Sequence, residues 1–408
     1  MATVIYDQPE RYALAYNDNP YVIRAVPTSS TIRYKIIIFT PALVEVATML
    51  VYNRQGVTAN GVVTEDRTYF DPSRILQSQV SSCIAIPSAN HASYFDCASL
   101  GFDYAIGIRE QEKVNGVYVD GDLTITDVKT VWNGGIKKLD WLGFDYTDYD
   151  MVDGASTPKF LTNAPSTQYV DSDQSAFLSF LNSNQDVVKL NLVSYEADGS
   201  LVQIGSVDIA PTTDFAYVAV GPYDIENSDF SNWTSGSPAT FLNNAAYYTV
   251  SVSTNTASEV FTFQLNQRCS KYEPVRLHWL NRLGGFDSFN FSLKSSEMTD
   301  IDRNSYLSQE HNFTGTRWDY TKASRGTTDY YVGTKDKLKI NTPYLTEAES
   351  VWMEDFATSP EVYMEVNNEL IAMSGLPKMI NKMTSLNDKL MQYEFELDYS
   401  LTDMRQRG

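Results

Sequence analysis

An acidic and aromatic segment, WLGFDYTDYDMVDG, carries residue types that bind ions or sugars. Its carboxylates could ligate calcium, or two of them could serve a glycosidase. They are Asp145, Asp148, Asp150 and Asp153. Four aromatic residues beside them could stack on sugar rings, namely Trp141, Phe144, Tyr146 and Tyr149. The order of the acids does not match an EF-hand loop, so we favour a Tyr-rich and Asp-rich surface that suits a protein interface.

Histidine occurs only at His91, His278 and His311, and none lies in an HExxH motif or beside a GxSxG elbow. The chain also has no P-loop and no GxGxxG motif. We therefore expect no enzyme activity, no catalytic residue, no metal and no cofactor. His278 lies in an alternating segment, which predicts a surface or interface histidine, and a general-base role is the alternative.

The three cysteines, Cys83, Cys97 and Cys269, lack the paired short spacings of zinc sites. Cys83 and Cys97 could pair, but so few cysteines favour reduced, packed thiols and synthesis in a bacterial cytoplasm. The first residues have neither the basic nor the apolar part of a secretory signal. No apolar run approaches the ~20 residues of a membrane span, so we expect none.

The formal net charge of −20 disfavours tight binding to DNA. The charge is uneven, because residues 271–345 hold 11 basic and 9 acidic residues, which leaves 20 basic and 42 acidic residues elsewhere. This asymmetry would allow identical copies to dock head to tail. A solvated acidic surface is the alternative interpretation.

The composition predicts a mainly β protein, built from antiparallel β-sandwich domains with a few short helices. Hydrophobic residues make up 43% and charged residues 20% of the chain, a balance typical of an ordered globular protein. The high content of Tyr, Thr and Val favours sheet over helix. We expect three domains, at residues 1–155, 156–268 and 269–408, the last with one short helix at 346–357.

The segment from Cys269 to Leu293 predicts a half-buried hairpin. Its alternating apolar residues are Val275, Leu277, Trp279, Phe289, Phe291 and Leu293. Arg276 and His278 point to the opposite face, and Gly284 and Gly285 permit the turn.

Other strands are expected at residues 31–39, 218–221, 247–253 and 260–265. Three Gly-containing pairs predict tight turns, namely Asn115 with Gly116, Asp120 with Gly121, and Asp198 with Gly199. The last pair predicts a two-residue hairpin turn between two eleven-residue segments rich in β-forming residues.

Two helices are expected. A brief helix capped by Asp171 or Asp173 would run to Leu181, and Thr346 with Glu349 matches a capping box. Near the end of the chain, residues 393–399 alternate between apolar and acidic side chains, which predicts a strand in the sheet of the same subunit or of a neighbour.

Three segments resemble virion structural proteins of tailed bacteriophages of Bacteroidota, the crAss-like phages among them. The first is NPYVIRAVPTSSTIRYKIIIF followed by TYFDPSRIL, the second is YEPVRLHWLNRLGGFDSFNF, and the third is YLTEAESVWMEDFATSPEVYMEV followed by KLMQYEFELDYS. They are spread along nearly the whole chain. This resemblance implies assembly into a particle and no turnover of a substrate.

The resemblance implies a structural subunit of the virion, in the portal-proximal neck or tail ring or in the tail assembly. Its partners would be copies of itself in a ring and other neck or tail proteins, with genome DNA met at most non-specifically in an axial channel. Our candidate interface residues are Arg276, Trp279, Arg282, Tyr393, Phe395 and Tyr399, and a core role is the alternative for the aromatic ones. The competing functions are a carbohydrate-binding β-sandwich for receptor recognition and a glycoside hydrolase.

Overall fold

The computed structural model describes residues 4–24, 32–52, 67–84, 94–154, 157–227, 233, 237–254, 256–265, 271–309, 312–319, 322–323, 325–367, 369–375, 391–401 and 403–404. His91, Cys269 and His311 lie outside these residues. Among the described residues, no helix has both the length and the apolar character needed to cross a bilayer.

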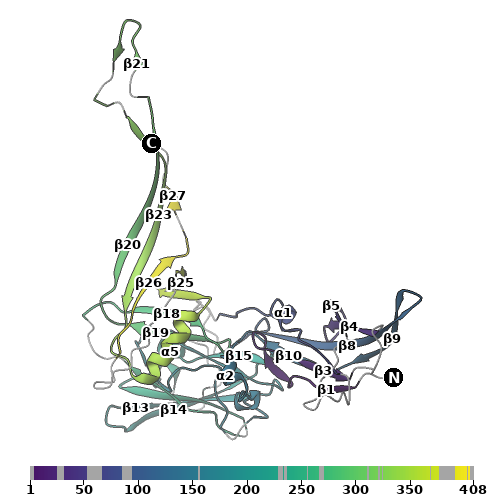
Figure 1. Cartoon of the computed structure of the whole chain (residues 1–408). Coiled ribbons are helices and arrows are strands. Elements are labelled where there is room, and N and C mark those ends of the chain that lie inside the picture. Colours follow the sequence, from purple (N-terminus) through teal and green to yellow (C-terminus); the bar gives the residue numbers. More distant parts are fainter. Residues whose placement is uncertain are drawn as a thin grey trace. The chain divides into compact units, whose positions relative to one another are not determined.

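The chain forms two compact units. Unit 1 comprises Met1–Ala85, Ala89–Asn266 and Asn281–Asp287, and unit 2 comprises Ile86–Ser88, Gln267–Leu280 and Ser288–Gly408. Both consist mainly of β-strands with a few short helices, which confirms the predicted fold class (Figure 1). The finer division into three domains stays a prediction.

Unit 1 contains two hydrophobic cores, and the first lies within residues 13–131. It joins a three-stranded sheet to a six-stranded sheet. The first sheet consists of β1 (Ile5–Asp7), β3 (Tyr21–Arg24) and β6 (Arg67–Phe70). The second consists of β2 (Tyr12–Leu14), β10 (Lys129–Trp132), β8 (Gly101–Val114), β4 (Ile32–Phe39), β5 (Glu45–Tyr52) and β9 (Val117–Ile125). Helix α1 (Ser73–Leu76) follows β6 in the sequence.

The predicted strand at residues 31–39 is confirmed as β4, where Tyr34, Ile36 and Ile38 are fully buried. Asn115 and Gly116 form the predicted turn between β8 and β9, both with positive φ. The turn predicted at Asp120 and Gly121 is wrong, because both residues lie inside β9. The register shifts there, and a Cβ on Gly121 would lie 3.0 Å from the carbonyl oxygen of Glu110. Glycine therefore marks an irregularity in the ladder at this position.

The second core lies within residues 151–263 and fills a sandwich of two sheets. One sheet consists of β11 (Thr167–Val170), β17 (Phe261–Leu265), β16 (Tyr247–Ser253), β13 (Val188–Tyr195) and β14 (Leu201–Ile209). The other consists of β12 (Phe177–Leu181), β15 (Phe215–Ala219) and β7 (Tyr94–Asp96). The short helices of this part are α2 (Lys138–Trp141), η1 (Tyr146–Asp148), α3 (Pro222–Asn227) and α4 (Pro238–Phe241).

Two expectations in this sandwich need correction. The brief helix predicted up to Leu181 is strand β12, all five of whose residues are buried. A short apolar run buried on both faces has no strand alternation, so its spacing resembles that of a helix. The hairpin at Asp198 and Gly199 is confirmed, but its turn is longer than two residues. The amide of Gly199 donates to the carbonyl of Glu196, and Glu196 N also donates to Ser200 O.

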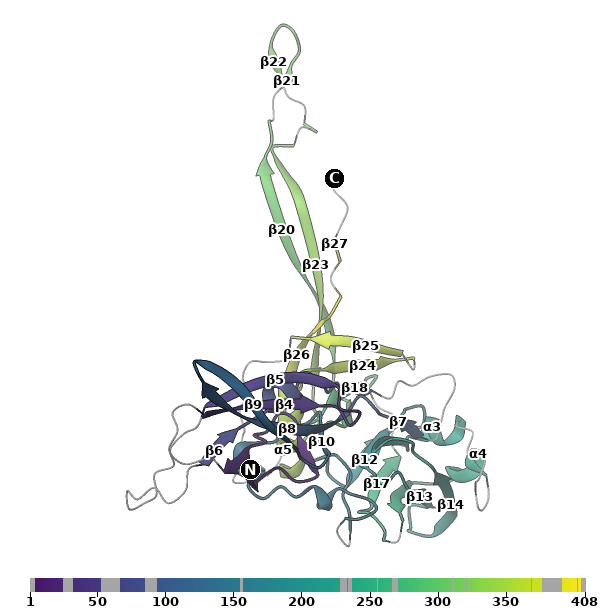
Figure 2. The ribbon, with the colours of Figure 1, turned by 90° about the vertical axis from the view of Figure 1, so that its right-hand side faces the viewer.

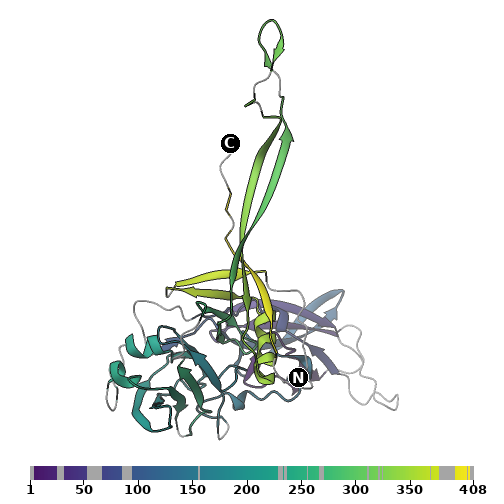
Figure 3. The ribbon, with the colours of Figure 1, turned by 90° about the vertical axis from the view of Figure 1, so that its left-hand side faces the viewer.

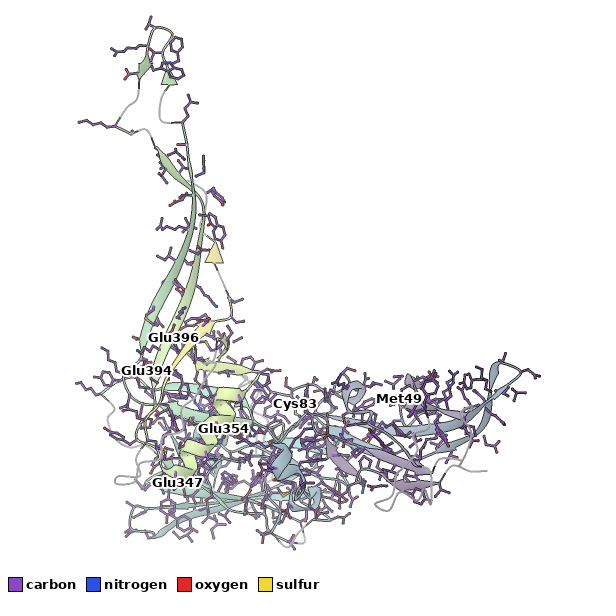
Figure 4. The ribbon with its side chains drawn as sticks, in the orientation of Figure 1. Met49, Cys83, Glu347, Glu354, Glu394 and Glu396 are labelled. Atoms are coloured by element: carbon purple, nitrogen blue, oxygen red, sulfur yellow. A yellow bond between two sulfur atoms is a disulfide. The ribbon has the colours of Figure 1, made fainter. Side chains whose placement is uncertain are left out.

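Cys83 and Cys97 form a disulfide with a Cα–Cα distance of 5.8 Å, so the expectation of reduced thiols is wrong for this pair (Figure 4). The peptide amide of Cys97 donates to the carbonyl of Phe215 in β15. The disulfide thus ties the segment after α1 to the edge of the three-stranded sheet. Sequence spacing alone could not select pairing over free thiols.

Unit 2 is built around an eight-stranded sheet. Its strands are β19 (Phe286–Phe291), β18 (Val275–Leu280), β24 (Val362–Val366), β25 (Glu369–Ser374), β26 (Glu394–Tyr399), β23 (Thr327–Asn341), β20 (Ser296–Leu307) and β27 (Asp403–Met404). The small hairpin of β21 (Asn312–Phe313) and β22 (Trp318–Asp319) lies between β20 and β23 in the sequence. Helix α5 (Glu347–Thr358) follows β23.

Aromatic side chains join α5 to this sheet. The ring centroid of Trp279 lies 5.0 Å from that of Trp352 and 5.2 Å from that of Phe356, and Phe356 lies 4.9 Å from Phe395. The capping box is confirmed, because Thr346 Oγ1 accepts from Glu349 N and the Glu349 carboxylate accepts from Thr346 N. The predicted C-terminal strand is confirmed as β26, paired with β23 and β25 of its own chain.

The predicted hairpin is confirmed as β18 and β19, but it is more deeply buried than expected. Arg276 and His278, on the face expected to be exposed, are only 5% and 3% exposed. The turn belongs to unit 1, and Gly284 adopts a φ of 91°. A Cβ on Gly285 would lie 2.1 Å from Ser179 Oγ. The two glycines therefore permit close packing as well as the turn.

Candidate functional site

A long arm of two strands is an exposed part of unit 2. Strands β20 and β23 pair antiparallel from Ser296 opposite Lys339 to Leu307 opposite Thr327. The arm extends from the sheet, and the β21–β22 hairpin lies at its far end (Figures 1 and 2). All 12 residues of β20 are exposed. The arm is not among the predicted elements, although the alternation of Lys335, Lys337 and Lys339 with Asp336 and Leu338 signals a strand.

Salt bridges fix the base of the arm to β26. Lys339 Nζ lies 2.7 Å from Glu394 Oε1, and Lys337 Nζ lies 3.3 Å from Glu396 Oε1 (Figure 4). Between these charges, Leu338 and Ile340 are buried against the core. The base is thus anchored by burial and pairing. In the upper arm, which comprises residues 303–307 of β20 and 327–332 of β23, the two strands pair only with each other among the described residues.

Large apolar side chains are exposed along the upper arm and at its tip. Tyr306 is 52% and Tyr330 is 51% exposed, and their ring centroids lie 6.3 Å apart. At the tip, the Phe313 and Trp318 rings lie 5.6 Å apart, with exposures of 55% and 62%. Exposed aromatic clusters of this kind are typical of surfaces that become buried in an assembly.

A pocket of about 310 Å³ in unit 1 gathers several residues of the acidic and aromatic segment. Its lining includes Asp140, Asp145, Asp148, Tyr149, Lys159 and Arg282. Burial, followed by the charges of Asp148 and Glu259, raises the pKa of Tyr149 to about 12, so its hydroxyl stays protonated. The carboxylates, cations and tyrosine together suit a small polar ligand.

The four carboxylates of this segment accept hydrogen bonds or form a salt bridge within the protein. Asp145 Oδ1 accepts from Thr147 N and caps η1, and Asp148 Oδ2 lies 3.2 Å from Lys159 Nζ. Asp150 is 1% exposed and accepts from the amides of Val152 and Ser183. Asp153 accepts from Asn184, so the four acids hold turns and loops in place. In the described part of the chain, no group of three or more His, Cys, Asp or Glu residues could hold a metal.

The aromatic residues of the segment stack on one another. Phe144 lies between Trp141 and Tyr149, with ring centroids 5.3 Å and 5.7 Å away and nearly parallel planes. Tyr146 packs against Tyr12 at 5.3 Å. Stacking within the protein occupies faces of these rings that a sugar would otherwise use.

A buried polar network links β18, β19 and β24 in unit 2. His278 Nε2 lies 2.8 Å from Glu365 Oε2, and His278 Nδ1 lies 2.8 Å from Ser288 Oγ. Arg276 Nε lies 3.3 Å from the same carboxylate oxygen, and its Nη1 donates to Asn290. The carboxylate favours a proton on Nε2, so the Ser288 hydroxyl donates to Nδ1.

This network has the residue types of a hydrolytic triad, but its burial indicates a structural role. His278 is 3% exposed, which corrects the expectation of a surface or interface histidine. Burial lowers the pKa of His278 below 6.5. The charge of Arg276 lowers this pKa further, and Glu365 raises it without cancelling the effect of burial. The neutral ring can therefore bridge a hydroxyl and a carboxylate across three strands.

The six candidate interface residues lie in three different environments in the structure. Trp279 and Phe395 are 0% and 1% exposed in the core under α5, and Tyr393 is 8% exposed with its hydroxyl 2.7 Å from Ser350 Oγ. With Arg276 also buried, these four side chains stabilise the fold of unit 2. Arg282 lines the pocket of unit 1, and Tyr399 donates to Glu297 at the base of the arm. Contact of these residues with a neighbouring subunit stays a prediction.

No protein-family model and no curated protein matches the chain. Among solved structures, the chain is similar to a tetra-tandem repeat in the extending region of a large adhesion protein. The identity is 10%, the match covers 83% of this chain and 69% of that chain, and the TM-score is 0.20. A likeness this distant carries no argument about function.

Proposed function

We propose that the chain is a structural subunit of a tailed-phage virion, in the neck or tail ring or in the tail assembly. The arm of β20 and β23 is the observation that carries this proposal. A ribbon of only two strands is marginally stable in water, and its open edges invite pairing with another chain. A subunit whose neighbours surround such an arm gains contacts that a monomer lacks.

The charge of the chain supports the same proposal, and its disulfide is compatible with it. The net charge of −20 would keep genome DNA from adhering to a channel lined by this protein. The Cys83–Cys97 disulfide is compatible with synthesis in the bacterial cytoplasm followed by oxidation in the released particle. Neck and tail proteins of the particle would be its further partners.

Mass spectrometry of purified virions tests this function directly. The chain should be present in intact particles in multiple copies, and cryo-electron microscopy should place it in a ring or in the tail. Absence from purified particles would contradict the proposal. Carboxylates that all face away from an axial channel would contradict only its electrostatic part.

A carbohydrate-binding role in receptor recognition is the second candidate, and the pocket in unit 1 favours it. Binding on a glycan array should then be lost in Tyr149→Ala and weakened in Trp141→Ala, whose ring supports Phe144. Leu139→Ala is a matched control, because Leu139 is 89% exposed on α2 and does not line the pocket. Equal glycan binding by all three variants would contradict this role.

A further inference from the structure

The two edges of the arm differ in how much of their length has a strand partner. The outer edge of β23 is paired with β26 from Lys337 to Asn341 and with β27 at Gly333 and Thr334. From Thr327 to Val332, it has no further strand partner among the described residues. The outer edge of β20 has none along its whole length in the same part of the chain. Among the described residues, residues 303–307 of β20 and 327–332 of β23 therefore have two open strand edges, in the arm drawn in Figure 3.

Pairing of β20 with β20 of a second copy is disfavoured by charge. When two copies of one strand pair antiparallel about a two-fold axis, directly opposed side chains lie on the same face of the sheet. Side chains alternate between the faces along a strand, so two opposed residues have either both odd or both even numbers, and their sum is even. The four registers with the longest overlap are centred on residues 300, 301, 302 and 303. They place Asp300 opposite Asp300, Asp300 opposite Asp302, Asp302 opposite Asp302, and Arg303 opposite Arg303. Like charges directly opposite one another destabilise a strand pair.

Pairing of β20 with β23 of a second copy avoids this repulsion. Copies related by rotation about an axis along the arm keep the same height along that axis, so residues 303–307 of one β20 lie beside residues 327–332 of the next β23. Arg303 and Asp329 pair within one arm, with Arg303 Nη1 3.0 Å from Asp329 Oδ2, but their side chains remain 58% and 37% exposed. Each can therefore also approach the opposite charge of the next copy. The exposed side chains of Tyr306, Leu307 and Tyr330 lie at the same level and would become buried.

We infer that the partner of the arm is a second copy of this chain, bound through the β20 edge of one arm and the upper β23 edge of the next. All arms then point the same way, neighbouring strands remain antiparallel, and the head-to-tail contact repeats until the ring closes. Closure leaves no open strand edge in the upper arm. This inference rests on the proposed function, because it names the contact that would build the ring.

Cysteine cross-linking between two singly substituted proteins tests the inference. Ser305→Cys and Thr327→Cys chains are mixed and treated with a short thiol-reactive cross-linker, so a mixed dimer can arise only between copies. We expect the mixed dimer to be the predominant product. Ser296→Cys with Lys339→Cys is the matched control, because β26 covers the β23 edge at that level. This control pair should give little mixed dimer.

Each other outcome contradicts the inference. A predominant Ser305→Cys homodimer would indicate pairing of β20 with β20, and equal yields from the test and control pairs would indicate random collision. A chain that stays monomeric in native mass spectrometry without cross-linking would also overturn it. The proposed function fails separately, through absence of the chain from virions. Presence in virions without the mixed dimer would overturn only the edge pairing.

Discussion

His278 and Glu365 are separated by 87 residues in the sequence, yet their side chains meet at 2.8 Å between neighbouring strands of unit 2. The imidazole is nearly inaccessible to solvent, and burial lowers its pKa below the unfolded value of 6.5. The unfolded chain therefore binds a proton at His278 before the folded chain does. The contribution of His278 to the free energy of unfolding is fully present above about pH 6.5, and it is lost as the pH drops through the pKa of the folded state.

This linkage predicts that unit 2 loses stability between pH 7.5 and pH 5.5. Hydrogen exchange of β18 amides, corrected for the intrinsic pH dependence, should show a smaller free energy of opening at the lower pH. His278→Gln removes the titrating group and should flatten this dependence. A slope that is the same in both proteins would show that another group controls it.

Removal of the Glu365 carboxylate should destabilise unit 2 strongly. Arg276 and Glu365 side chains are only 5% and 6% exposed, so Glu365→Ala leaves a buried guanidinium without its counter-charge. Loss of one member of a buried pair costs about 3–5 kcal/mol. Urea unfolding monitored by hydrogen exchange of β18 measures the change.

Glu394→Ala is the matched control for this prediction. Glu394 pairs with Lys339 at 2.7 Å, but the two side chains are 58% and 36% exposed. An exposed pair contributes about 0–1 kcal/mol. Comparable losses in Glu365→Ala and Glu394→Ala would refute the assigned importance of the buried network.

Local sequence patterns predicted the elements whose alternation or capping is unambiguous. β4, β26 and α5 are examples, because each buries one regular stripe of side chains. The same patterns failed for β12, because burial on both faces removes the alternation of apolar and polar residues that indicates a strand. The pocket combines Asp148 with Lys159 and Arg282, and the network combines His278 with Glu365. Such long-range contacts leave no local signal, so only the fold reveals them.

The turn of the β18–β19 hairpin should tolerate no side chain at Gly285. A Cβ there would lie 2.1 Å from Ser179 Oγ and 2.6 Å from the carbonyl oxygen of Leu161. Gly285→Ala should therefore cost about 1–3 kcal/mol through overpacking. Gly143→Ala is the control, because a Cβ added at Gly143 would meet no atom within 4 Å beyond its chain neighbours. Urea unfolding would contradict the packing argument if the two variants lost equal stability.

The Cys83–Cys97 disulfide should be detectable by its protection from alkylation. Peptide mapping without reductant should leave both cysteines unmodified by iodoacetamide, and prior reduction should expose both. The bond closes a loop with a sequence separation of 14. Closure of such a loop restricts the unfolded chain, so the Cys83→Ser, Cys97→Ser double variant should lose about 3 kcal/mol of unfolding free energy. Alkylation of both residues in the unreduced native protein would refute the bond, and an unchanged stability of the double variant would refute its contribution.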